Sequence, residues 1–380
     1  MRGAGALRAL LGAGLVWLAV AGPAPASGGS TGGLGGGWLL ERGDVPGMPE
    51  AWRPALHALG AMRRPGQPPA ERPALAVGAT WLARTIPWAQ LRAGGLRLVA
   101  TDLRHRSEVA ACLDLGVDGI GGDRPDLLVA ALAGLDGDGD GRGGDWLDAS
   151  GAPDPGRLEV RGFAGARGVR PEATLPGVEA ALDVGVTALE LPVRTTRDGR
   201  VVLSLDATVR PGKHRSLPGA PALGGGLMAE GPAIATLSLG DLRGRYDRAV
   251  RLAGQPAQSL DPEASPVALA FSRKQGWPSP HAYASLEEVF GFLRAYADHH
   301  AAGPGRLLPE GPRRARAAGR VRVVVAVPAG PGGATAGRAA LEAARRAGML
   351  ERLTLSASGP DTLVRLHSEA PRVAVELVLP

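Results

Sequence analysis

The sequence predicts an α/β fold that closes as a (β/α)8 barrel, because strand and helix signals alternate along most of its length. In the passage from Gly165 to Val209, apolar residues recur at helical spacing between Leu175 and Val184, and a buried-strand run follows from Thr187 to Val193. The pair Asp198-Gly199 then turns the chain into a further strand at Val201. Alternation of this kind implies parallel strands joined by crossover helices.

Eight strands are expected in all, which is the number that closes a TIM-type barrel. Two strands belong to a short N-terminal portion, and they start at Leu96 and Ile120. The other six belong to the long C-terminal portion and start at Arg161, Thr187, Val201, Val321, Leu353 and Val373. The stretch between the portions, residues 135–157, is rich in Gly and Asp and is expected to be a linker.

The N-terminus has the features of a secretory signal peptide. Two arginines flank the start, an apolar run extends from Ala9 to Ala21, and Ala24-Pro25-Ala26 supplies small residues for cleavage. The run is short for a membrane span, and an uncleaved anchor is the alternative. We expect a signal peptide over 1–26, a flexible leader over 27–37, and a secreted protein without a stable membrane anchor after cleavage.

The formal net charge of +6 comes almost entirely from arginine, and it raises the question of an anionic partner. A nucleic-acid surface would combine basic runs with aromatic residues, but aromatics make up only 4% of the chain. Nucleic-acid binding is therefore not expected. The single cysteine, Cys112, excludes an internal disulfide.

The passage around Gly165 resembles the opening of the glycerophosphodiester phosphodiesterase family. That family begins with His-Arg-Gly, continues with Pro-Glu-Asn-Thr, Glu-Leu-Asp-Val and Asp-Gly, and then has a strand that ends in His-Asp. The corresponding residues here are Ala166-Arg167-Gly168, Pro171-Glu172-Ala173-Thr174, Glu190-Leu191-Pro192-Val193, Asp198-Gly199 and Leu205-Asp206. The resemblance implies a barrel of the phospholipase C-like (PLC-like) phosphodiesterase type.

The short N-terminal portion resembles the closing part of the same family. Leu115 to Ile120 matches its Leu-Gly-Val-Asp-Gly-Ile, and Asp123 to Asp126 matches its Asp-Arg-Pro-Asp. Residues 38–134 would then hold the last two barrel strands, and residues 158–380 the first six. A circular permutation explains this order, because a flexible linker of this length spans roughly 25 Å. A tandem pair of truncated barrels is the alternative.

The resemblance also implies which residues should carry the chemistry, and most of these positions are changed. The family's catalytic histidine pair falls on Ala166 and Leu205, neither of which can transfer a proton. Its metal-binding carboxylates fall on Glu190, Pro192 and Ala326, so only Glu190 remains as a weak ligand for Ca²⁺ or Mg²⁺. No bound cofactor is expected, although the family uses a divalent cation.

Several polar residues near these positions are candidates for a binding site. Arg167 keeps the family's phosphate-contacting position and is expected either to bind phosphate or to form a salt bridge. Glu172 and Asp206 are pocket candidates, with an arginine pair and a turn cap as their alternatives. Glu376 is expected either to point inward toward Glu190 or to lie in a salt bridge.

Two further features leave alternatives open. His214 is either a solvated loop residue or a substitute acid–base group. The run Asp136 to Gly141 has alternating aspartates, like the start of a calcium loop, but the twelfth position holds Leu147, and a solvated acidic linker is the alternative.

Two functions follow from these observations. The first is an exported phosphodiesterase of lipid metabolism whose activity is impaired or carried by other residues. The second is a non-catalytic barrel that binds a phosphodiester, another phosphorylated small molecule, or a protein partner.

Overall fold

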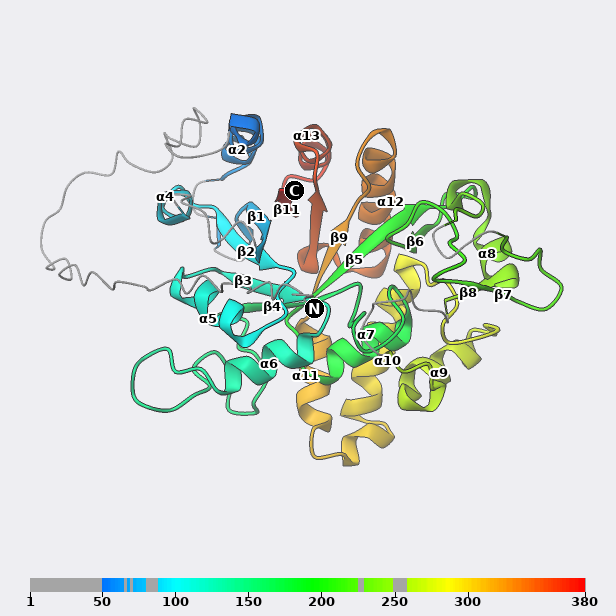
Figure 1. Cartoon of the computed structure of the whole chain (residues 1–380), viewed down its shortest axis with the longest axis horizontal. Coiled ribbons are helices and arrows are strands. Elements are labelled where there is room, and N and C mark those ends of the chain that lie inside the picture. The colour runs from blue at the N-terminus through cyan, green and yellow to red at the C-terminus, as the bar shows by residue number, and fades with distance from the viewer. Residues whose placement is uncertain are drawn as a thin grey trace, which may run out of the picture. The chain divides into compact units, whose positions relative to one another are not determined.

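Eight parallel strands pair side by side in the computed structural model and close into one barrel (Figure 1). The order around the barrel is β4-β3-β2-β1-β11-β10-β9-β5, and β5 pairs with β4 to complete the ring. The barrel strands are β1 (Ala74–Gly78), β2 (Arg97–Thr101), β3 (Gly119–Gly122), β4 (Glu159–Phe163), β5 (Ala188–Thr195), β9 (Arg322–Ala326), β10 (Leu353–Ala357) and β11 (Ala374–Leu379).

The structure describes residues 50–64, 67–68, 71–79, 88–224, 229–248 and 258–379, all within one unit of the chain, Gly35–Pro380. The expected signal peptide and leader lie outside these residues. Within them, no helix is both long enough and apolar enough to cross a membrane.

Helices surround the strands (Figure 1). In the N-terminal portion they are α2 (Arg53–Ala61), α4 (Trp88–Ala93), α5 (Arg106–Asp114) and α6 (Pro125–Ala133). In the C-terminal portion they are α7 (Leu175–Asp183), α8 (Leu239–Arg245), α9 (Pro266–Lys274), α10 (Leu286–Ala301), α11 (Gly311–Arg320), α12 (Pro331–Ala347) and α13 (Pro360–Glu369).

Shorter elements connect these helices and strands. The outlying strands are β6 (Val201–Leu203), β7 (Arg215–Ser216) and β8 (Tyr246–Asp247). The 3-10 turns are η1 (Glu50–Trp52), η3 (Ile234–Thr236), η4 (Pro262–Ala264), η5 (Pro304–Leu307) and η6 (Leu350–Arg352). Between α6 and β4 the chain has no helix or named strand.

The expected eight-stranded barrel is confirmed, but the membership of one strand was wrong. The strand at Val201 is β6, which pairs antiparallel with the far end of β5 as a hairpin outside the ring. The eighth barrel strand is β1, at Ala74–Gly78, which the sequence reading did not include. The N-terminal portion therefore supplies three barrel strands and the C-terminal portion five.

The strands at Leu96 and Ile120 lie where a single closed barrel requires them, between the last strand and the strand at Arg161. The ring runs from β11 through β1, β2 and β3 to β4, so both portions complete one barrel. Two separate truncated barrels are excluded for the described residues. Whether this order is a permutation of an ancestral one stays a prediction.

Alternate strand residues face opposite sides of the barrel wall, as the period of a strand requires. On β1, Leu75 and Val77 belong to the large apolar core between strands and helices. Ala74 and Ala76 belong instead to a small separate cluster with Val99 of β2. The interior of the barrel is therefore lined by small residues on this side, which leaves room for long side chains from the opposite wall.

The loop after β4 is fixed by local backbone contacts that place the start of α7. The Thr174 side chain caps α7 by accepting a hydrogen bond from the Gly177 amide at 3.2 Å. Gly165 has φ +85°, and a Cβ atom there would lie 2.5 Å from the Gly177 carbonyl carbon. This close approach holds the α7 backbone against the loop that carries the positions of the family's first motif.

We expect Gly165→Ala to destabilise the protein more than Gly199→Ala. Both glycines have positive φ, and alanine in that conformation costs about 1–2 kcal/mol. A Cβ at Gly199 (φ +74°) would meet no atom within 4 Å. The Gly199→Ala variant therefore measures only the cost of placing alanine in this backbone conformation. The clash at Gly165 should add about 1–3 kcal/mol. Urea denaturation of the two variants measures the difference, and equal losses would contradict the close packing.

Candidate functional site

The positions of the family's catalytic and metal-binding residues gather at the carboxyl ends of β4, β5 and β9, where active sites of such barrels form. Ala166 is buried in the apolar core, and Leu205 is half-buried beyond β6. Pro192 of β5 pairs directly with Ala326 of β9. Glu190 lies two residues earlier on β5, on the same side of the strand as Pro192. Most of the positions to which the resemblance assigns a metal and a histidine pair therefore hold side chains that cannot bind metal or carry a proton.

The polar residues at this end of the barrel, which we call the mouth, are paired with one another. Arg167 donates to Asp123 at 2.6 Å and lies 3.9 Å from Glu172. Lys213 contacts both Glu172, at 2.7 Å, and Asp206, at 2.8 Å. Each predicted pocket residue of the mouth is therefore part of a salt-bridge cluster. One oxygen of Glu172, Oε2, is buried without a hydrogen bond among the described residues.

His214 is not a solvated loop residue, because its side chain is buried against Tyr283. The Tyr283 hydroxyl lies 2.7 Å from Nε2, and the Arg210 amide donates to Nδ1 at 3.1 Å. Burial and the nearby Arg248 cation lower the pKa of His214 to about 3. The imidazole is therefore neutral over the ordinary pH range, and both of its nitrogens are already engaged.

A network of charged side chains fills the barrel interior, and Arg161 of β4 lies at its centre with no exposure to solvent. Its guanidinium makes a bidentate pair with Glu376 of β11, with distances of 2.9 and 2.5 Å. It also contacts Glu159 at 2.5 Å and Glu190 at 3.7 Å. Because β4 and β11 stand on opposite sides of the ring, this pair ties the two walls together.

The wall beside Arg161 is built to accommodate it. Gly121 of β3 pairs with Arg161, and a Cβ on that glycine would lie 3.1 Å from the Arg161 Cβ. Gly119 has the same relation to Glu159, which also accepts a hydrogen bond from Arg97 at 2.8 Å. Small residues on one wall thus leave space for the charged residues of the next.

The surrounding charges act differently on two of the three glutamates of this network, Glu159 and Glu190. Burial opposes ionisation of Glu159, but Arg161 and Arg97 outweigh it and hold its pKa well below the usual range. Burial dominates at Glu190, where the Glu376 charge adds to the effect of burial and Arg161 only partly offsets it, so that the pKa of Glu190 is raised to about 7. Glu190 is therefore incompletely ionised at neutral pH.

Glu376 lies in a salt bridge inside the barrel, and its partner Arg161 also contacts Glu190, so features of both expectations for Glu376 are present. Arg167 pairs with Asp123 and Glu172 instead, in the mouth. A divalent cation at Glu190 would have to compete with a buried guanidinium and with a bound proton. The residues present therefore do not fit a divalent metal centre at this position.

Sequence reasoning missed Arg161, Arg97 and Lys213 as members of the site. Arg161 was considered only as the start of a strand. The segment Glu159-Val160-Arg161 carries charges two residues apart in a buried strand, so both must face the same side. In a closed barrel whose outer face is covered by helices, that alternation indicates charges inside the barrel.

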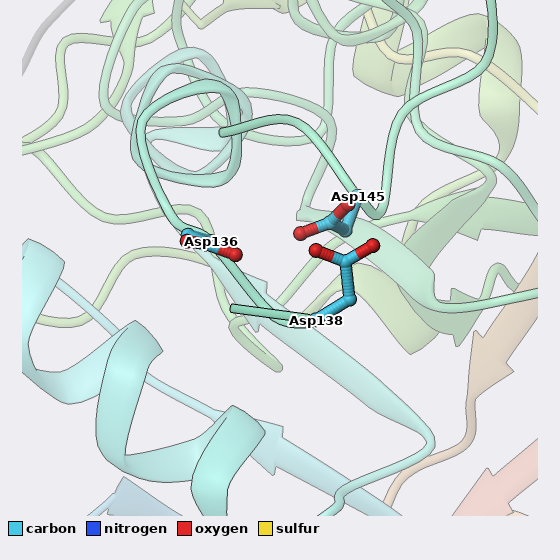
Figure 2. A group of neighbouring side chains, drawn as sticks. All are labelled: Asp136, Asp138 and Asp145. Atoms are coloured by element: carbon cyan, nitrogen blue, oxygen red, sulfur yellow. The ribbon is translucent and has the colours of Figure 1, made fainter. Parts of the chain in front are cut away.

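Three carboxylates of the segment between α6 and β4 lie close together (Figure 2). One oxygen from each of Asp136, Asp138 and Asp145 lies within 4.8 Å of the others. The Gly139 and Gly141 amides donate to Asp136 at 2.7 and 2.8 Å, which lowers the pKa of that carboxyl. These residues are at the surface, and the calcium-loop hypothesis for them stays open.

The fold is similar to solved structures of phosphodiesterases. A protein assigned as a glycerophosphoryl diester phosphodiesterase from Silicibacter pomeroyi aligns over 58% of this chain with 22% identity and a TM-score of 0.42. A glycerophosphodiester phosphodiesterase from Agrobacterium tumefaciens aligns over 57% with 14% identity and a TM-score of 0.35. An Oleispira antarctica phosphodiesterase, solved with sn-glycerol-3-phosphate, aligns over 57% with 15% identity and a TM-score of 0.35.

The chain spans 63, 65 and 64% of the length of these three proteins, respectively. No protein-family model matches the sequence, and no curated protein matches it.

We expect Arg161→Met to destabilise the protein by on the order of 3–5 kcal/mol at pH 8, because three buried carboxylates would lose their shared cation. This loss of stability should be smaller at pH 5, where the unpaired carboxylates take up protons. Arg338→Met removes an exposed pair with Glu369 and should cost less than about 1 kcal/mol. Urea midpoints at both pH values test this, and a deficit as small as the control's would contradict the role of Arg161.

We expect Glu190→Gln to stabilise the protein at pH 8 but not at pH 5. The raised pKa of Glu190, about 7, means that the folded state binds a proton that the unfolded state has released. This contribution to stability is therefore lost as pH rises from about 4.5 to about 7. Glutamine does not titrate, so the difference between variant and parent should grow over that window.

Thermal unfolding of the Glu190→Gln variant between pH 5 and 8 measures this effect. Glu342→Gln, which changes an exposed glutamate on α12, is the matched control and should show no such slope. A Glu190→Gln variant that is less stable than the parent at every pH would mean that Arg161 holds the charged form after all.

Proposed function

We propose that this chain is a phosphodiesterase-type barrel in which an internal salt-bridge network replaces the catalytic centre, so that it does not hydrolyse phosphodiesters. The observation that carries the proposal is the Arg161 guanidinium, which contacts Glu190 and Glu376 at the level where the family would hold its metal. The resemblance of the sequence to the family leads us to expect a metal-dependent phosphodiesterase. The Arg161 network is the reason that we propose no hydrolysis.

The two positions to which the resemblance assigns proton transfer hold no group that can carry a proton. The two histidine positions hold Ala166 and Leu205, and His214 is buried with both nitrogens hydrogen-bonded. A positioned acid or base contributes on the order of 10²–10⁴ in rate. Loss of both therefore removes most of the catalysis that such a barrel could supply.

Stabilisation of negative charge by a metal is also lost. A metal-dependent hydrolysis needs a cation to polarise the phosphate or activate water. The only retained ligand, Glu190, has a raised pKa and lies 3.7 Å from a permanent cation. Pro192 and Ala326 face each other without a ligand atom between them.

What remains at the mouth favours binding over catalysis. Arg167, whose side chain is 23% exposed, and Lys213 carry positive charge beside a carboxylate oxygen of Glu172 that lacks a hydrogen bond. We propose that this end of the barrel binds a phosphorylated small molecule or a partner protein rather than turning over a phosphodiester. The signal-like N-terminus supports export, and the strand order supports a permuted barrel.

Glycerophosphocholine incubated with the full-length protein and millimolar Ca²⁺ or Mg²⁺ should release no more choline than buffer does. Restoring Ala166→His and Leu205→His should change little, because the metal site would still be missing. Adding Pro192→Asp and Ala326→Glu should bring metal-dependent turnover. Hydrolysis by the unmodified protein that disappears in Glu190→Gln but not in Glu342→Gln would overturn the proposal.

A further inference from the structure

We propose that the opposite end of the barrel, at the amino ends of the strands, holds a second site that binds a small molecule with two or more phosphate groups. A cavity of about 680 Å³ opens there. It is lined by the residues that start or precede the strands, among them Arg97 of β2, Glu159 of β4 and Arg322 of β9. Its volume lies within the range of ordinary small-molecule sites.

The charge of this cavity is strongly positive. Seven arginines line it, against three carboxylates. One of the carboxylates, Glu159, is already held by Arg97 and Arg161, and another, Asp118, accepts a hydrogen bond from the Leu98 amide and lies 3.6 Å from Arg92. Little negative charge is therefore left for the remaining arginines.

Two adjacent guanidiniums in the wall lack an ion-pair partner among the described residues. Arg322 donates to the Thr354 hydroxyl at 3.1 Å, and its Nε is buried without a hydrogen bond. Arg352, just before β10, donates to the Val321 and Ala318 carbonyls. Burial lowers the pKa of both groups. The Glu159 charge offsets part of this effect at Arg322, and a bound anion would supply a further counter-charge to both guanidiniums.

The exposed rim adds cations that are free to move toward a ligand. The side chains of Arg72 and Arg320 are exposed, line the cavity, and make no hydrogen bond or ion pair within the described part of the chain. Guanidinium groups bind phosphate oxygens in pairs of parallel hydrogen bonds. The cavity is larger than one phosphate and has cations on several walls. These two features favour a ligand with more than one phosphate group.

Inorganic triphosphate is a suitable probe, measured by titration calorimetry with the full-length protein in metal-free, low-salt buffer. We expect one-site binding that is at least tenfold tighter than that of orthophosphate, and a rise in the melting temperature. Absence of triphosphate binding, or equal weak binding of both anions, would overturn the proposal.

The double variant Arg72→Gln/Arg320→Gln should lose about tenfold or more in triphosphate affinity. It removes exposed side chains without described partners, so its melting temperature without ligand should match that of the parent. The control Arg338→Gln/Arg345→Gln removes the same charge from the surface of α12 and should bind as the parent does. An equal loss in the control would mean non-specific attraction.

Arg322→Gln tests the wall of the cavity independently of the rim, and it should also weaken binding at least tenfold. Arg167→Gln changes the mouth, at the other end of the barrel, where the proposed function places a phosphorylated ligand. Binding of triphosphate that is lost in Arg322→Gln but kept in Arg167→Gln would place this anion at the amino ends of the strands. Loss of binding in Arg167→Gln alone would place the anion at the mouth and refute the second site. Triphosphate binding and glycerophosphocholine hydrolysis are measured in separate experiments. Failure of the second-site proposal is therefore distinguishable from failure of the proposed function.

Discussion

The ion pairs around Arg161 are the constraint on which the barrel interior depends. Three carboxylates from three strands converge there, and without a cation they would repel one another at buried positions. The bidentate pair with Glu376 joins opposite walls, while Glu159 extends the network toward Arg97 at the amino ends of the strands. Branched apolar side chains usually fill this space, so the charged interior sets this barrel apart.

The same interaction connects the stability of the interior to how well Glu190 could serve a metal. A retained carboxylate such as Glu190 is useful to a metal only when it is ionised and unshared. Here burial favours its protonated form, and the nearest cation is a guanidinium that cannot leave. Glu190 as it stands in this chain is therefore a poor ligand for a metal.

The sequence predicted the barrel well because strand and helix periodicities are local signals. It failed at the two strands where local signals mislead. Val201–Leu203 is as apolar as a barrel strand, but the turn at Asp198-Gly199 makes it antiparallel. Ala74–Gly78, which follows α2, is a run of small and apolar residues that the sequence reading did not count as a strand. The site was harder still, because the partners of Arg161 lie as far as 215 residues away, and only closure of the ring brings them together.

The two ends of the barrel differ in how their charges are satisfied, and this difference carries the functional argument. At the mouth, each of the main acids, Asp123, Glu172 and Asp206, has a cation within hydrogen-bond distance. At the amino ends, cations outnumber acids, and Arg322 and Arg352 rely on hydroxyl and carbonyl oxygens. Charges that balance one another gain less from a bound anion than a surplus of cations beside a cavity does. The end of the barrel that usually serves stability is therefore the end of this chain with the stronger electrostatic reason to bind an anion.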